Sequence, residues 1–378
     1  MLALSLLLSA ALAAASNGPH RVHHAECSKV SFDVSASGDN AVFATLPDRQ
    51  NETAVIGWIN DRFGDLGAPA AGTQHISGTY KIAGVYCWPT RGPSRGVLEL
   101  LVHGLSYNKS MWTGLGYGNE YDWQAYAASR GYHTLAIDRL GHGSSEPNSD
   151  PFNTVQVPLQ IDIYHQLIRA IRKGGRTSPL RRSFCRIVWV GHSFGSQFGS
   201  AMAQQYPNDF QAIVLTAYSN QLNTSSPPGA PYASASVLFP KRYRGADLGY
   251  FVTSTLQGRT AAFYAGDYDP AVAYGDYLYQ DTMSAGEIGT FLDAAPRSIP
   301  EYRGGVMVVS GDRDAICCNI QGVTCNSILS GTSVVFPNAA DYGFYAPPNT
   351  GHDLTLHLTA PSTFREVHNW LDSYFHHR

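Results

Sequence analysis

The sequence predicts an α/β fold in which a mostly parallel central sheet carries helices on both faces and an inserted cap. Continuous apolar runs, typical of strands buried on both faces, alternate with stretches of helical spacing. This alternation stops near residue 220 and resumes near residue 301. The chain has 378 residues, of which 44% are hydrophobic, which is enough for one large core or two smaller ones.

The first 16 residues have the composition of a secretory signal peptide. Residues 2–15 are apolar or small and carry no charge, and Ala13, Ala14 and Ala15 form a small-residue cleavage site. The run is too short to span a bilayer, and no other stretch is long and apolar enough to do so. We therefore expect a secreted protein whose mature chain begins near Ser16 or Asn17.

The mature chain is expected to form a core from residues 17–219 and 301–378. Residues 29–37 and 77–89 alternate polar and apolar side chains, which indicates an antiparallel edge, with a loop between them. Helical spacing, often ended by Gly or Pro, predicts helices over 120–131, 154–175, 194–207 and 361–375. Apolar runs predict buried strands within 96–104, 132–145, 186–193, 210–219, 304–314 and 333–339.

Residues 220–300 are predicted to be a cap or lid inserted between two consecutive core strands. The segment is rich in Tyr, Pro, Gly, Asp and Ala and lacks strong buried strands. Its aromatic content argues against disorder. A cap in this position lies over the carboxyl ends of the strands, where open α/β sheets bind ligands. Its aromatic side chains either line a pocket for an apolar or aromatic group or pack the cap's own core.

Six cysteines agree with export, because an even count in a secreted chain indicates disulfides. Cys317 or Cys318 is expected to pair with Cys325 across a short loop, and Cys27 with Cys87. Asn-x-Ser/Thr sequons at Asn51, Asn108 and Asn223 are candidate glycan sites in a secreted chain.

Composition also excludes some partners. The net charge is −3, only 15% of residues are charged, and there is no Lys/Arg run, so nucleic-acid binding has no support. No second Cys/His pair stands at zinc-finger spacing, and we expect neither a metal nor a cofactor.

The motif Gly-His-Ser-Phe-Gly at residues 191–195 is the strongest chemical signal. It joins a predicted strand to a predicted helix, and a tight turn there holds Ser193 in a strained conformation with its hydroxyl at the top of the sheet. Gly191 and Gly195 leave room for the neighbouring backbone. These observations make Ser193 a candidate nucleophile.

A nucleophilic serine needs a base and an orienting carboxylate. His352 lies in the loop between the last predicted strand and the last helix, and Asp314 follows the fifth buried strand, with Asp312 as the alternative acid. The chain order is then Ser, Asp, His. The backbone amides of Leu105 and Phe194 are the predicted oxyanion hole.

Together these motifs resemble the α/β-hydrolase superfamily in its cap-bearing esterase and lipase branch. The resemblance runs from about Val97 to Phe375 through "LLVHGLSYN", "DRLGHGSS", "GHSFG", "SGDRD" and "TGHD". It implies hydrolysis of a small-molecule ester through an acyl-enzyme, and it makes His142 structural. Cofactor-free haloperoxidases, hydroxynitrile lyases and acyltransferases share the serine triad, and a catalytically inactive secreted binding protein is a further alternative.

Overall fold

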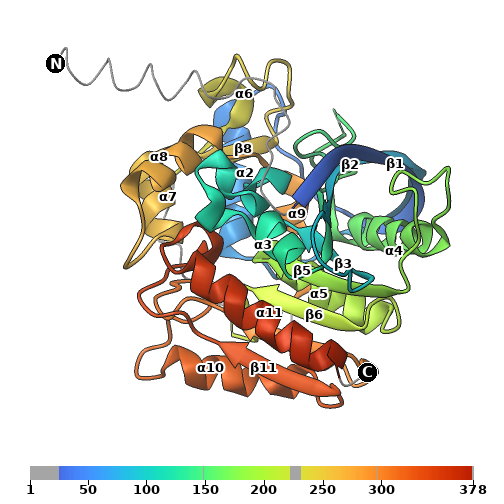
Figure 1. Ribbon diagram of the computed structural model, residues 1–378. Helices are drawn as coiled ribbons and strands as arrows, with labels where there is room; N and C mark the ends of the chain where they lie inside the picture. The colour runs from blue at the N-terminus through green and yellow to red at the C-terminus, as the bar shows by residue number, and fades with distance from the viewer. Residues whose placement is uncertain (1–24, 148, 222–230, 296, 377–378) are drawn as a thin grey trace, which may run out of the picture.

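The computed structural model describes residues 25–147, 149–221, 231–295 and 297–376. The predicted signal peptide and Asn223 lie outside these residues. An eight-stranded sheet with the strand order β1-β2-β4-β3-β5-β6-β10-β11 forms the centre of the molecule (Figure 1). The pairings β1–β2 and β2–β4 at one edge are antiparallel, and the other pairings are parallel. This architecture confirms the predicted fold class.

The six parallel strands are short, and all except the edge strand at Asp341–Tyr345 are almost entirely buried, as expected for a sheet covered on both sides. They are β3 (Val97–Val102), β4 (His133–Ile137), β5 (Arg186–His192), β6 (Ala212–Thr216), β10 (Gly305–Val309) and β11 (Asp341–Tyr345). The two antiparallel strands are much longer and comprise β1 (Ala25–Val42) and β2 (Gly72–Pro89). Cys27 lies directly opposite Cys87 in this pair, and the two form the expected disulfide.

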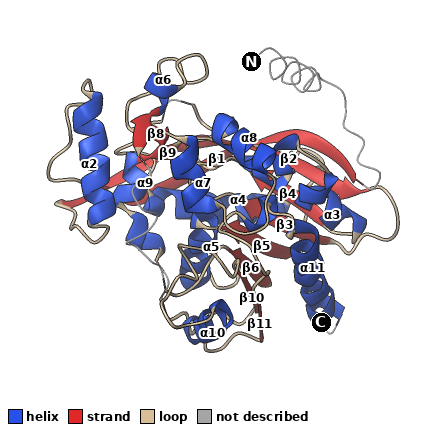
Figure 2. Ribbon diagram, turned by 90° about the vertical axis from the view of Figure 1, so that its left-hand side faces the viewer, coloured by secondary structure: helices blue, strands red, loops and turns tan. Residues whose placement is uncertain are grey.

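Alternate side chains of β3 point to opposite faces of the sheet. Leu98, Leu100 and Val102 belong to one core cluster, together with apolar residues of α4 (Val157–Lys173) and α5 (Phe194–Gln205). Val97 and Leu101 belong to the other cluster, with residues of α3 (Trp123–Ser129) and α11 (Ala360–His376). Helices therefore cover both faces of the sheet (Figure 2).

The stretch between β1 and β2 was expected to be a loop, but it contains the helix α2 (Glu52–Gly64). Asn51 caps this helix by accepting a hydrogen bond from the amide of Ala54. Val55 and Ile59, four residues apart on one face, are fully buried against Phe251 and other residues of the insertion. The spacing that defines this face is present in the sequence, but its partner is distant in the chain.

The insertion between β6 and β10 has its own small sheet, of β7 (Tyr232–Ser234), β8 (Tyr250–Thr253) and β9 (Met283–Ser284). Its helical elements are α6 (Ala235–Leu238), α7 (Leu256–Phe263), α8 (Pro270–Tyr279), α9 (Ala285–Gly289) and η5 (Phe291–Ala294). Figure 1 shows α7 and α8 side by side in the yellow-to-orange part of the chain. We refer to the described residues 231–300 as the cap.

The predicted last strand at residues 333–339 is wrong. Residues Thr332–Val335 form a 3-10 helix that follows α10 (Cys325–Gly331), and the strand β11 begins at Asp341. Pro337 cannot donate a ladder hydrogen bond, which disfavours a strand at that position. The aromatic run Tyr342–Tyr345 pairs with β10 instead, in parallel register.

Candidate active site

Ser193 lies in the turn between β5 and α5, with φ 53° and ψ −115°. A positive φ is unusual for a serine and marks a strained turn. The glycines on either side make this turn possible. A Cβ on Gly191 would lie 2.4 Å from the carbonyl oxygen of Gly195, and one on Gly195 would lie 2.1 Å from that of Val102. The close packing fixes Ser193 at the end of the central strand.

His352 and Asp314 meet Ser193 in a continuous hydrogen-bonded set. The Nε2 atom of His352 lies 2.8 Å from Ser193 Oγ, and its Nδ1 atom lies 2.9 Å from each carboxylate oxygen of Asp314. His352 is 1% exposed and Asp314 is fully buried, whereas Ser193 is partly exposed. Of the three residues, only Ser193 therefore keeps contact with solvent.

His352 and Asp314 each shift the pKa of the other in the direction that favours its charged form. Burial by itself would raise the pKa of Asp314, but the charge of His352 and hydrogen bonds from His352 and from the Cys317 and Ile316 amides outweigh it and lower the pKa. Burial by itself would lower the pKa of His352, but Asp314 raises it by more. Asp314 is thus held ionised and His352 is a stronger base than an isolated buried imidazole.

The alternative acid Asp312 is not brought to His352. It is exposed and accepts a hydrogen bond from the amide of Thr350, 3.2 Å away. The loop that carries Asp314 is fixed by the disulfide between Cys318 and Cys325, one of the pairings that the sequence left open. Cys317 is a free, buried thiol that donates to the carbonyl of Ala217 at 3.2 Å.

The two predicted oxyanion-hole residues both belong to segments next to the Ser193 turn. Phe194 is the first residue of α5, so its amide is one of the N-terminal helix donors without an intrahelical acceptor. Leu105 follows Gly104, where a Cβ would lie 3.0 Å from the carbonyl oxygen of His192 and 3.1 Å from Ser193 Cβ. The loop after β3 therefore runs directly against the serine turn. Both residues therefore stay candidates for the oxyanion hole.

Two aromatic side chains of the cap pack onto this site. The ring of Phe263 stacks on His352 with 5.7 Å between centroids, and the ring of Phe291 stacks on Phe194 at 5.1 Å. Most other cap aromatics pack within the cap, as Tyr232 and Phe251 do at 5.2 Å. Some aromatic side chains of the cap therefore border the Ser193 site, and others pack the cap's own core.

His142 does not approach the serine. Its Nε2 atom lies 3.0 Å from Glu287 in α9, and its Nδ1 atom lies 3.0 Å from Thr282. Arg139 pairs with the same buried glutamate and lies over the ring of Phe194, 5.2 Å from its centroid. Arg139 and His142 outweigh the effect of burial and lower the pKa of Glu287 to about 2. Sequence reasoning missed Glu287 because only the fold brings it to the Asp138–Ser145 turn.

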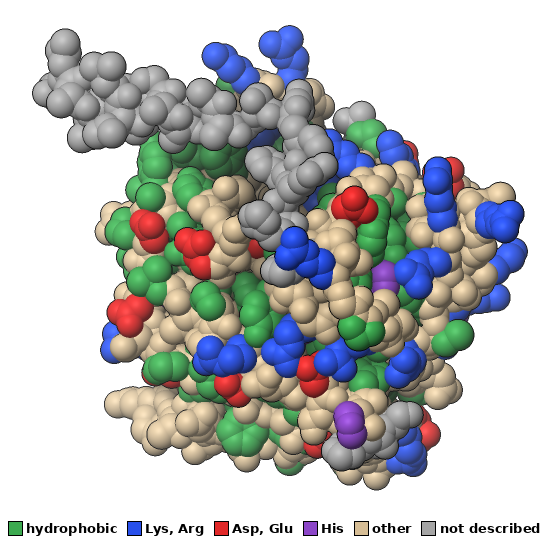
Figure 3. Space-filling model, viewed as in Figure 1, with side chains coloured by type: hydrophobic (Ala, Val, Ile, Leu, Met, Phe, Trp, Pro, Cys, Tyr) green, Lys and Arg blue, Asp and Glu red, His purple; other side chains and the backbone are tan. Residues whose placement is uncertain are grey.

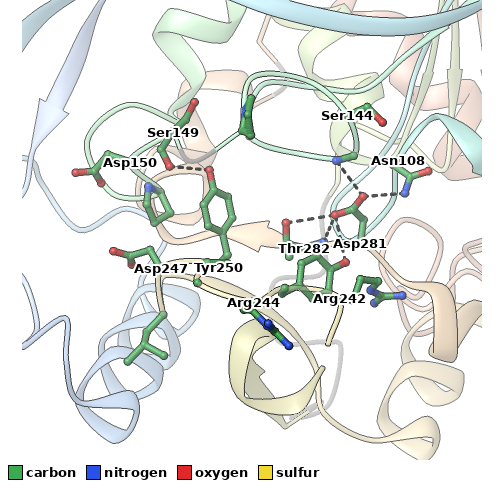
Figure 4. A pocket seen from close by; sticks show the side chains of 18 of the residues that line it. Asn108, Ser144, Ser149, Asp150, Arg242, Arg244, Asp247, Tyr250, Asp281 and Thr282 are labelled. Atoms are coloured by element: carbon green, nitrogen blue, oxygen red, sulfur yellow. Dashed lines mark hydrogen bonds between the residues drawn. The ribbon is translucent and has the colours of Figure 1, made fainter. Parts of the chain in front are cut away.

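A cavity of about 1220 Å³ opens beside this turn, between residues 141–151 and the cap segment 242–250. Figure 4 shows Asp281 on its wall, bonded to Asn108 and Thr282, with Arg242 and Arg244 on the side of the cap. Ser193, His352 and Asp314 are not among the residues that line it. Its lining is mainly polar, unlike the aromatic surroundings of His352.

One group of potential metal ligands occurs in the described part of the chain. Atoms of Asp314, Cys317 and His352 lie within 4.8 Å of one another. Each of these residues already has a hydrogen-bond partner in the set described above. Within the described ranges, no helix combines the length and apolar character that a membrane span requires. Figure 3 shows basic side chains spread over one face of the molecule, with acidic ones among them.

Comparison with known proteins agrees with the geometry. A model of the family described as "Alpha/beta hydrolase family" matches residues 100–367. No curated protein matches the sequence significantly. Among solved structures, an enol-lactonase from Burkholderia xenovorans is similar with a TM-score of 0.50 and 16% identity, over 77% of this chain and 96% of its own. An epoxide hydrolase from Vigna radiata also reaches a TM-score of 0.50, at 13% identity, over 78% of this chain and 95% of its own. At these identities the likeness concerns the fold.

Proposed function

Because the chain belongs to the alpha/beta hydrolase family, we propose that it is a secreted serine hydrolase that cleaves carboxylic esters. The observation that carries this proposal is the bonded set of Ser193, His352 and Asp314 at the end of the central strand. A serine hydroxyl is a weak nucleophile by itself, and a base within hydrogen-bond reach that is oriented by a carboxylate activates it.

In the proposed reaction, Ser193 Oγ attacks the carbonyl carbon of the ester while His352 Nε2 takes the hydroxyl proton. The carbonyl oxygen becomes an oxyanion, which the amides of Leu105 and Phe194 stabilise. The C–O bond to the alcohol then breaks, and His352 gives its proton to the leaving oxygen. The acyl group remains on Ser193. Asp314 keeps the imidazole oriented and stabilises its positive charge.

Water completes the reaction. His352 removes a proton from a water molecule, whose oxygen attacks the acyl carbon and forms a second oxyanion intermediate. Collapse of this intermediate breaks the bond to Ser193 Oγ, which recovers the proton from His352. The products are a carboxylic acid and an alcohol. The partial exposure of Ser193 is consistent with access of water to the acyl group.

We propose that the substrate is a small ester with an apolar or aromatic group. The stacking of Phe263 on His352 and of Phe291 on Phe194 supports this class, because aromatic walls favour apolar ligand groups. Export through a signal peptide at residues 1–16 is part of the proposal. The two disulfides support it, because disulfides persist in oxidising compartments.

Two measurements on the purified protein test the function. The first is turnover of p-nitrophenyl esters of increasing acyl length, and the second is labelling by a fluorophosphonate. We expect the wild type to show turnover and labelling, and also an acyl-enzyme burst when the leaving phenol departs rapidly. We expect neither labelling nor turnover with Ser193→Ala. Ser129→Ala, at the exposed end of α3, is the matched control and should behave as wild type.

Absence of labelling and of turnover in the folded wild type would reject the esterase proposal in favour of a binding protein. Labelling of Ser193 without turnover of any ester would indicate a lyase or haloperoxidase. Transfer of the acyl group to an added alcohol in preference to water would indicate an acyltransferase.

A further inference from the structure

A second acid–histidine pair lies beside the first and is built from its chain neighbours. His192 precedes Ser193, and Asp353 follows His352. The Nε2 atom of His192 lies 3.1 Å from Asp353 Oδ1, and both side chains are fully buried. The rings of His192 and His352 lie 5.4 Å apart between centroids. The strand that carries the nucleophile and the loop that carries the base are therefore joined twice.

Asp353 also connects this site to the cap. Its Oδ2 atom accepts a hydrogen bond from the hydroxyl of Tyr107, which also lies 2.8 Å from Asp276 Oδ2 in α8. Arg259 in α7 binds both carboxylate oxygens of Asp276, at 2.8 and 2.7 Å. All of these side chains are buried. A continuous chain of hydrogen bonds thus runs into the cap from the loop that carries His352 and Asp353, which we call the base loop.

The backbone of Asp353 is held by the same neighbours. Its amide donates to the carbonyl of Phe263, the cap residue whose ring stacks on His352. Its carbonyl accepts from Nδ1 of His357 at 2.8 Å. Arg259 also contacts the loop after β3 that carries Leu105, which we call the oxyanion loop, by donating to Ser106 Oγ at 2.9 Å. Asp353 and its partners therefore connect the cap, the oxyanion loop, the strand β5 and the base loop.

The two carboxylates of this cluster, those of Asp276 and Asp353, differ in whether a cation is bound directly to them. Asp276 has the guanidinium of Arg259 as its partner. Burial lowers the pKa of His192 and outweighs the opposite effect of Asp353, so His192 is neutral at neutral pH. Burial would raise the pKa of Asp353, but its bond to His192 and the nearby positive charges lower it by more. Asp353 is therefore an anion whose direct partners, His192 and Tyr107, are neutral donors.

An anion that lacks a cationic partner of its own favours a positive charge that forms nearby. The imidazolium of His352 is such a charge, because it forms whenever Ser193 or water is deprotonated. Among the residues that the structure describes, the other charged or titratable groups beside His352 are Asp314 from the acid loop, His192 from β5, and the thiol of Cys317. Asp353 joins Asp314 in raising the pKa of His352.

We propose that Asp353 is a positioning residue that ties the base loop to the nucleophile strand and to the cap, and that its negative charge adds to that of Asp314 at the His352 imidazole. The inference rests on the proposed hydrolase function and deepens it. It makes the cap a part of the catalytic apparatus, because Arg259 and Asp276 hold Tyr107 against Asp353.

The test is the pH dependence of kcat/KM in Asp353→Asn, measured with the best p-nitrophenyl ester on the full chain. Asparagine has the same shape and can accept from His192 and donate to Tyr107, so the fold should persist. Without the negative charge the imidazolium is less stable, and the acidic midpoint should move to lower pH by roughly one unit. We expect kcat to fall roughly tenfold.

Two further variants separate charge from shape. Asp312→Asn removes an exposed carboxylate from the neighbouring acid loop and should leave both the rate and the midpoint unchanged. Tyr107→Phe breaks the link to the cap but keeps the charge of Asp353, so kcat should fall while the midpoint stays near that of the wild type. If Asp353→Asn does not fold, Asp353→Ser, which is also neutral, is measured in its place.

A neutral Asp353 variant with a lower rate but an unmoved midpoint would overturn the charge role, because a purely structural defect reduces activity equally at every pH. A wild-type kcat in Tyr107→Phe would overturn the link to the cap. Either failure is distinct from failure of the function itself, which requires that the wild type not turn over esters or that Ser193→Ala remain active.

Discussion

Gly195 packs directly against Val102, and a Cβ on Gly195 would lie 2.1 Å from the carbonyl oxygen of Val102. The atom in the way belongs to a central strand and cannot move aside as a side-chain tip can. We expect Gly195→Ala to shift the turn at Ser193, lower Tm and abolish fluorophosphonate labelling. The destabilisation should be about 1–3 kcal/mol, the range found for overpacked cores. Thermal melting and labelling measure the two effects.

Gly57→Ala is the control for this substitution. Gly57 lies in the exposed part of α2, where a Cβ would meet no atom within 4 Å. Alanine is favoured over glycine in a helix by about 0.5–1 kcal/mol, so this variant should melt at the same temperature or slightly higher and label normally. Normal labelling of Gly195→Ala would contradict the geometry of the turn.

The pH dependence of the wild type follows from the raised pKa of His352. The imidazole accepts the serine proton only when it is neutral, so activity should fall as the pH drops through this pKa. Because Asp314 raises the pKa, the acidic midpoint of kcat/KM should lie above 6.5, the ordinary value for histidine. A pH profile with a neutral ester checks this, and a midpoint below 6.5 would show that burial outweighs the charge of Asp314.

Asp314→Asn should reduce kcat on the order of a thousandfold or more, because an amide neither orients the imidazole correctly nor stabilises its charge. Protein stability should change less than activity. A large loss of activity in Asp312→Asn, together with an active Asp314→Asn, would reverse the assignment of the acid.

The sequence predicted those features that depend on local patterns. The buried strands are continuous apolar runs, and the turn at Ser193 needs two glycines at fixed positions within one motif. Asp314 and His352 follow strands whose carboxyl ends meet at one edge of a parallel sheet, so their proximity to Ser193 follows from the topology. The disulfide of Cys27 and Cys87 follows from two strands that pair as neighbours.

The features that were missed depend on contacts between distant segments. The apolar face of α2 is buried by Phe251, almost 200 residues further along the chain, which no local pattern shows. The roles of Asp353 and Glu287 likewise come from partners in other elements. The strand predicted at 333–339 is wrong for a local reason, because its apolar residues were given more weight than Pro337 among them.

The free cysteines should differ sharply in reactivity. Cys185 is exposed, whereas burial raises the pKa of the Cys317 thiol far above its usual range, so that little thiolate forms. Native protein should take up one N-ethylmaleimide, at Cys185. Protein unfolded without reductant should take up two, because two cysteines are free. Mass spectrometry of intact protein and of its peptides measures both.

Reduction before unfolding provides the control, because all six cysteines should then be labelled. Modification of Cys317 in native protein at a rate similar to Cys185 would contradict its burial beside Asp314. Labelling of Cys318 or Cys325 without reductant would contradict their disulfide.

Export should leave a mature chain that begins near Ser16 or Asn17 and carries sugar at Asn51 but not at Asn108. Asn51 is exposed at the start of α2. Asn108 is half-buried, and its Nδ2 atom, where the sugar would attach, donates to the buried carboxylate of Asp281 at 2.7 Å while Oδ1 accepts from the Ser110 amide at 2.9 Å. Enzymatic deglycosylation converts an occupied asparagine to aspartate, which peptide masses reveal site by site. Retention of Met1 would reject export, and a sugar on Asn108 in folded protein would show that its bond to Asp281 is dispensable.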